Sequence, residues 1–193
     1  GRTDLSDSGL SIVVKQSGDA VATAGNSQFR PLLESIPEGQ AIEVTAGWHE
    51  GMGWQAIRTR DGRLHPLVLP EKKLPSWKQV EERLRDLDQV VALDSSLSSG
   101  MALLRGGGLV CWSLTEKDPS VPVPEDVKNI VEIACGQKNF LALSADGTVW
   151  NWDERGRPIA SLPSFDKKVV AIRANRAAGP GAAAQLEDGT WVA

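Results

Sequence analysis

The sequence predicts an all-β propeller of about five blades or part-blades, each with three to four antiparallel strands, and one short helix inserted near 76–87. Three observations predict this fold. A hairpin with a glycine turn occurs five times, its third-strand position recurs every 40–45 residues, and four of the five hairpins follow a further apolar strand. A repeat of this length, with three or four strands in each unit, is typical of propeller blades.

The clearest unit lies between residues 129 and 153 and reads NIVEIACGQKNFLALSADGTVWNWD. Two apolar runs flank Asp146-Gly147, which is among the strongest hairpin signals because the turn needs residues that tolerate positive φ. A third apolar run, 131–135, comes before them and ends in small residues. The unit therefore predicts three short strands in succession.

The other units repeat this order. Their turns are Gly18-Asp19, Asp61-Gly62, Gly106-Gly107, Asp146-Gly147 and Asp188-Gly189. The predicted upstream strands are 42–47, 91–96, 131–136 and 170–175. The predicted units are about 10–37, 38–88, 89–126, 127–165 and 166–193, which together form a single repeat domain, 10–193. Residues 1–9 are polar and are expected to be a linker or a remnant of cloning.

The chain begins on a second strand and stops on a third strand of the repeat. Two interpretations follow. Either the chain is a fragment of a larger propeller, or its terminal strands pair with each other and close the ring.

One stretch between the second and third units has helical rather than strand periodicity. Its apolar residues recur at helical spacing: Trp77, Val80, Leu84 and Leu87. Ser76 and Gln79 have the spacing of a capping box, so Ser76 is expected to cap the helix. The helix is expected to cover a blade edge, because exposed edges invite aggregation; docking of a partner is the alternative.

Three proline-rich connectors, 29–37, 118–124 and 157–163, separate the units. Proline cannot donate a hydrogen bond to a central ladder, so these segments are expected to be outer strands or loops between blades. They are expected to supply the weak fourth strand of each blade.

The motifs IACG (133–136), LAL (141–143) and DGTVWNW (146–152) closely resemble the repeat of the regulator of chromosome condensation family. The resemblance covers about 11–193 and is strongest in the fourth unit. It implies a propeller fold; related folds serve as exchange factors, enzyme inhibitors and scaffolds. Asn139 stands where the family often has histidine. Residues 94–96 read DSS where Ala-Cys-Gly is expected. These departures favour a divergent, bacterial version and weaken any transfer of a specific partner.

Composition narrows the classes of partner. The net charge is −4 and the pI about 5.3, so no basic stripe is available to neutralise nucleic-acid phosphates. No run of 18 apolar residues and no signal segment occur, which predicts a soluble segment without membrane insertion and leaves the localisation unknown. The two cysteines, Cys111 and Cys135, lack metal-site spacing and are interpreted as buried small residues.

No constellation of catalytic residues is recognisable. The chain has two histidines, His49 and His65, and no Gly-x-Ser-x-Gly elbow or phosphate-binding loop. The recurring aspartates Asp61, Asp146 and Asp188 are explained by turn geometry. The sequence therefore predicts a protein that is not an enzyme, with no catalytic, metal or cofactor site.

The remaining candidate is a surface. In a propeller, the loops between first and second strands open on one face; here they are 47–53, 96–100, 136–139 and 175–181. The candidate partner-binding residues on this face are Trp48, His49, Trp54, Lys138, Asn139 and Arg176. Exposed aromatic residues are typical of interface hot spots. The alternative is that Trp48 and Trp54 fold back over the blade.

We therefore expect a non-catalytic protein-binding module that grips an unidentified protein through its loop face. A carbohydrate-binding, lectin-like propeller with tryptophan platforms is one alternative. A structural repeat domain of a larger multidomain protein is another. Self-association through unpaired terminal strands also stays open.

Overall fold

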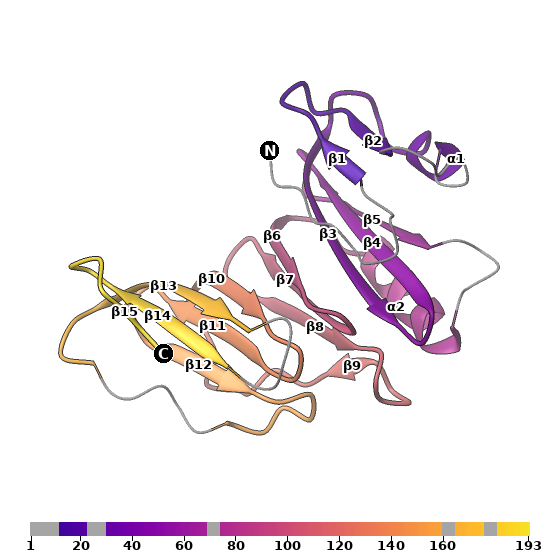
Figure 1. Cartoon of the computed structure of the whole chain (residues 1–193). Helices are drawn as coiled ribbons and strands as arrows, with labels where there is room; N and C mark the ends of the chain where they lie inside the picture. The colour runs from indigo at the N-terminus through magenta and orange to yellow at the C-terminus, as the bar shows by residue number, and fades with distance from the viewer. Residues whose placement is uncertain (1–11, 23–29, 69–73, 160–164, 176–180) are drawn as a thin grey trace.

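The computed structural model describes residues 12–22, 30–68, 74–159, 165–175 and 181–193. Within them, fifteen short strands form five small antiparallel sheets, accompanied by two helices. Every sheet is a meander in which neighbouring strands are consecutive in the chain, and the sheets follow one another along an arc (Figure 1). The predicted all-β propeller architecture is confirmed.

We call the sheets blades 1 to 5, in chain order. Blade 1 has β1 (Ile12–Val14) and β2 (Ala20–Ala22), and blade 2 has β3 (Ala41–His49), β4 (Met52–Thr59) and β5 (Leu64–Val68). Blade 3 has β6 (Val90–Ser95), β7 (Ser99–Leu104), β8 (Leu109–Ser113) and β9 (Ser120–Val121). Blade 4 has β10 (Ile130–Cys135), β11 (Phe140–Ser144) and β12 (Val149–Trp152), and blade 5 has β13 (Val169–Ala174), β14 (Ala182–Leu186) and β15 (Trp191–Val192).

The predicted glycine turns are all present. Their glycines have φ between +84° and +97°, and each turn joins two paired strands. In three turns an aspartate carboxylate accepts a hydrogen bond from the amide two residues on, as Asp146 does from Thr148 at 2.9 Å. This is the local bonding that makes aspartate a turn residue.

The blades shield one another's apolar sides. The inner strands β3, β6, β10 and β13 contact each other in succession (Figure 1). Four apolar clusters fill the spaces between blades. Blade 3 directs Val110 and Trp112 into the cluster shared with blade 2, and Met101 and Cys111 into the cluster shared with blade 4. Alternate residues point to opposite faces of a strand, so each central blade has two apolar faces.

Each inner strand of blades 2–5 carries a β-bulge near its start. The residues at the four register shifts are β-branched and 37–57% exposed: Ile42, Val91, Val131 and Val170. A bulge leaves its extra residue outside the ladder, so this recurrent exposure follows from strand geometry.

The predicted helix is α2 (Pro75–Arg85). It begins before Ser76, and its N-cap residue, Leu74, makes no side-chain capping bond. The capping role predicted for Ser76 is therefore wrong, because proline at the first helical position places Ser76 inside the helix. The apolar stripe is buried between blades 2 and 3: Trp77, Val80 and Leu84. The helix contacts β5, the outer strand of blade 2, as expected for an edge cover.

The proline-rich connectors behave differently from one another. Among the described residues, a fourth strand is present only in blade 3, where β9 pairs with β8. In blade 4 an isolated bridge joins Trp152 and Pro158. The connector 29–37 contains the short helix α1 (Arg30–Leu33). The expectation that every connector supplies a fourth strand is therefore wrong for the described part of the chain.

Candidate partner-binding surface

The strands β3 and β4 form a long hairpin whose end lies on the predicted loop face. Their ladder continues to the pair His49 and Met52 and leaves only Glu50 and Gly51 as the turn. Both turn residues have positive φ, 47° and 81°, as two-residue hairpin turns commonly require. The loop predicted for 47–53 is therefore wrong. Most of these residues belong to strands, whose side chains alternate between two faces.

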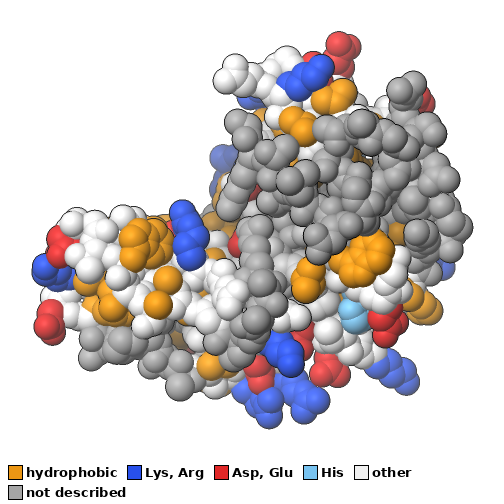
Figure 2. Space-filling view, viewed as in Figure 1, with side chains coloured by type: hydrophobic (Ala, Val, Ile, Leu, Met, Phe, Trp, Pro, Cys, Tyr) orange, Lys and Arg blue, Asp and Glu red, His pale blue; other side chains and the backbone are white. Residues whose placement is uncertain are grey.

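An exposed apolar pair lies where blades 2 and 3 meet. The amide of Trp48 donates a hydrogen bond to the carbonyl oxygen of Leu97 at 2.6 Å. A Cβ on the neighbouring Gly47 would lie 2.4 Å from that oxygen, so the close approach needs glycine. The side chains of Trp48 and Leu97 are 36% and 42% exposed. We call these two residues the Trp48–Leu97 patch; Figure 2 shows exposed hydrophobic side chains beside a histidine in this part of the molecule.

Trp54, also predicted for the surface, is fully buried. Its indole N–H donates to the carbonyl oxygen of Leu97 at 3.1 Å. Its ring lies 5.3 Å from that of Trp77 and 6.1 Å from that of Trp112, measured between centroids. Trp54 is thus a core residue that is hydrogen-bonded to Leu97 of the patch. The alternative interpretation, in which Trp54 folds back over the blade, is the correct one.

The other predicted residues also differ in how accessible their side chains are. His49 is partly buried at the end of the hairpin, 4.0 Å from Glu50. Lys138 is exposed in the turn between β10 and β11. Asn139 is fully buried, and its Nδ2 donates to Asn151 Oδ1 at 3.1 Å. Arg176 lies outside the described residues. Of the five predicted residues that the structure describes, Trp48, His49 and Lys138 have accessible side chains.

A cluster of hydrogen bonds that the sequence did not predict, which we call the polar clasp, connects blades 3 and 4. The Oε1 atom of Glu154 accepts hydrogen bonds from the hydroxyls of Ser113 at 2.5 Å, Thr115 at 2.8 Å and Ser99 at 3.3 Å. These contacts join residues at least 39 positions apart, and no local pattern marks them. These hydrogen bonds connect a turn of blade 4 with the strand ends of blade 3.

Reactive groups are scarce in the part of the chain that the structure describes. No group of three or more His, Cys, Asp or Glu side chains there is placed to hold a metal ion. Cys111 and Cys135 are both buried and free, and burial raises the pKa of both thiols well above the usual value. They are therefore protonated and weakly nucleophilic. No described helix has the length and apolarity needed to cross a bilayer.

Comparison with known proteins identifies the fold. No family model and no curated protein matches the sequence. Among solved structures, human WBSCR16 matches with a TM-score of 0.58 and 16% identity, over 78% of this chain and 46% of that chain. Prp20p from Saccharomyces cerevisiae matches with a TM-score of 0.51 and 15% identity, over 89% and 47%. Yeast RCC1 (Prp20), solved in a complex with Kap60, matches with a TM-score of 0.51 and 16% identity. The match covers 89% of this chain and 45% of that chain. The chain thus spans about half the length of these proteins.

Proposed function

We propose that this chain, which has the RCC1-like propeller fold, is a non-catalytic protein-binding module that contacts its partner through the Trp48–Leu97 patch. His49 follows Trp48 on the same hairpin, and Lys138 is an exposed, positively charged residue of the equivalent connection between the first and second strands of blade 4. The observation that carries the proposal is the patch itself. Two large apolar side chains from different blades are exposed together and fixed by a hydrogen bond between their backbones.

Two arguments support this use of the patch. Tryptophan is among the residues that dominate binding energy at protein interfaces, and a surface that is already ordered loses less entropy on binding. The solved Prp20p structure is described together with its binding to Gsp1p and histones, and another holds Kap60 bound to the same yeast protein. Those partners belong to that protein; for this chain they support a binding role of the fold.

The carbohydrate alternative is less well supported. It relied on Trp48 and Trp54 as sugar platforms, and Trp54 is fully buried. Nothing else in the described residues offers a second exposed tryptophan beside Trp48, since Trp191 lies on blade 5. A flat sugar ring would therefore have one platform instead of two.

The test is capture of partner proteins by the immobilised chain, comparing the wild type with Trp48→Ala and Leu97→Ser. Trp191→Ala is the matched control, because it removes a comparably exposed tryptophan from another blade. We expect one stoichiometric partner that the wild type and the control retain and both patch variants lose while staying folded. Retention by the folded Trp48→Ala variant would refute the proposal. Trp48-dependent binding to a glycan array, with no protein captured, would favour the lectin-like alternative.

A further inference from the structure

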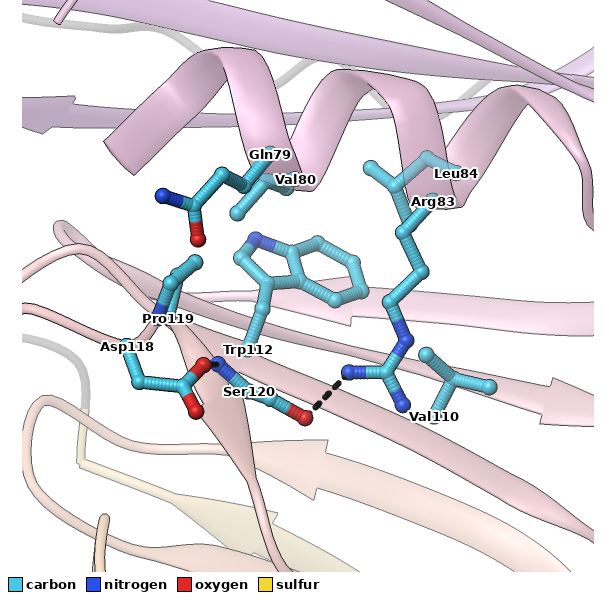
Figure 3. Close-up of a pocket in the computed structure, with 9 residues that line it drawn as sticks. All are labelled: Gln79, Val80, Arg83, Leu84, Val110, Trp112, Asp118, Pro119 and Ser120. Carbon is cyan, nitrogen blue, oxygen red and sulfur yellow. Dashed lines mark hydrogen bonds between the residues drawn. The ribbon is translucent and has the colours of Figure 1, made fainter. Parts of the chain in front are cut away.

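A groove of about 300 Å³ lies between α2 and the outer strands of blade 3 (Figure 3). Its apolar lining comes from Val80 and Leu84 of the helix and from Val110 and Trp112 of blade 3, each at most 8% exposed. One wall is the helix, and the other is the segment that leads into β9. Ligand sites usually combine such an apolar lining with a few convergent polar groups, and this groove has them on both walls.

Ser120 forms hydrogen bonds with two oppositely charged side chains of the groove, Asp118 and Arg83. Its amide donates to Asp118 Oδ1 at 2.9 Å, and its hydroxyl oxygen accepts a hydrogen bond from Arg83 Nη1 at 2.6 Å. Asp118 lies toward Pro119, and Arg83 lies at the opposite end (Figure 3). Within the described part of the chain, neither charged group has an ion-pair partner. The groove therefore offers a carboxylate at one end and a guanidinium at the other, each hydrogen-bonded to Ser120 and without an opposite charge beside it among the described residues.

The lining also contains a polar atom without a partner. Trp112 is 1% exposed, and its indole nitrogen has no hydrogen-bond acceptor among the described residues. In Figure 3 this nitrogen is on the same side of the groove as the exposed side chain of Gln79. A buried donor without an acceptor is costly.

We propose that this groove docks an extended segment of a partner protein, in which an apolar side chain lies between a basic residue and an acidic residue. The apolar side chain would lie on Trp112, the basic residue would pair with Asp118, and the acidic residue would pair with Arg83. A nucleic acid or a uniformly acidic ligand fits poorly, because Asp118 repels negative charge. The groove shares no residue with the Trp48–Leu97 patch, so this proposal is independent of the proposed function.

The test starts from random heptapeptides displayed on phage and selected on the folded full chain. We expect enriched peptides in which an apolar residue separates opposite charges. A fluorescently labelled enriched peptide then serves as the probe in anisotropy titrations. Arg83→Glu and Asp118→Lys should each weaken its binding by roughly tenfold, since each turns an attraction into a repulsion. The double variant should select peptides with the order of charges reversed.

The matched control is Lys78→Glu, which makes the same change of charge as Arg83→Glu at an exposed position of α2 outside the groove. It should change the affinity by less than about twofold. The proposal fails if no charge-flanked apolar sequence is enriched, or if Arg83→Glu binds the probe as the wild type does. If the affinity for the peptide falls in Trp48→Ala and not in Arg83→Glu, the peptide binds at the Trp48–Leu97 patch. That result would refute docking in the groove and would agree with the proposed function.

Discussion

The carbonyl oxygen of Gly62, in the turn of blade 2, accepts a 2.9 Å hydrogen bond from the amide of Val90, the first residue of the next inner strand. Gly18 makes the same contact with Ala41 one blade earlier. The turn of one blade therefore holds the start of the next. Glycine is needed there for its positive φ and also for the close approach.

Gly62→Ala should lower the free energy of unfolding by about 2 kcal/mol or more. The φ of this residue is +84°, and an added Cβ would lie 2.9 Å from the Cα of Gln89. Urea unfolding followed by tryptophan fluorescence measures the loss. Gly189→Ala is the control, because its φ is +88° and nothing lies within 4 Å. It should show only the backbone cost, about 1 kcal/mol; an equal loss in both variants would contradict a role for the contact between blades.

Gly100→Ala should displace the indole of Trp112, because the added Cβ would lie 2.1 Å from its Cζ2. We expect a loss of about 1–3 kcal/mol or more from overpacking, with a red shift of the tryptophan emission as the ring moves toward water. Gly108→Ala has its nearest neighbour at 3.7 Å, the side chain of Leu104. It should stay within about 0.5 kcal/mol of the wild type. Unchanged emission and stability in Gly100→Ala would show that the ring is not held as described.

The clasp between blades 3 and 4 can be measured with a double-mutant cycle on Glu154→Ala and Ser113→Ala. We expect a coupling energy of about 0.5–3 kcal/mol, because the two residues are in direct contact and partly buried. The exposed pair of Arg155 and Glu116, 3.5 Å apart, joins the same two blades and is the comparison. Its coupling should stay below about 0.5 kcal/mol. Equal coupling in the two cycles would mean that the hydroxyl cluster adds nothing.

Acid should destabilise blade 5 through Asp188. A hydrogen bond from the Lys167 ammonium, 2.5 Å away, is the main cause that lowers the pKa of this carboxyl from 3.8 to about 2. The folded-state pKa lies below the unfolded value, so the stabilisation is present above about pH 4 and is lost as the pH falls toward 2. We therefore expect the Tm to fall over this window, and to fall less in Asp188→Asn. Because both side chains are exposed, 0.5 M salt should reduce the difference. Identical profiles for the two proteins would contradict this account.

The fold was predictable where its determinants are local. Asp146-Gly147 and the apolar runs around it specify a hairpin without help from the rest of the chain. The surface was predictable only in part. Trp48 and Trp54 flank the same turn, but Trp48 is exposed and Trp54 is buried. The burial of Trp54 depends on α2 and on Trp112, which lie far along the sequence. Leu97 is the only apolar residue within DSSLSSG at 94–100, but its place beside Trp48 depends on a bond from another blade.

The inner strands β6 and β10 each contact two other inner strands, whereas β13 contacts one other inner strand, β10, in the described part of the chain. Among the described residues, opening blade 5 therefore breaks contacts with one neighbouring blade, whereas opening blade 3 breaks contacts with two. In a row of repeats that touch only their neighbours, cooperativity weakens toward the outer members. Backbone protons of β13, β14 and β15 should exchange with deuterium through local fluctuations that leave the centre of the row intact, so protection should rise from the fifth sheet toward the third.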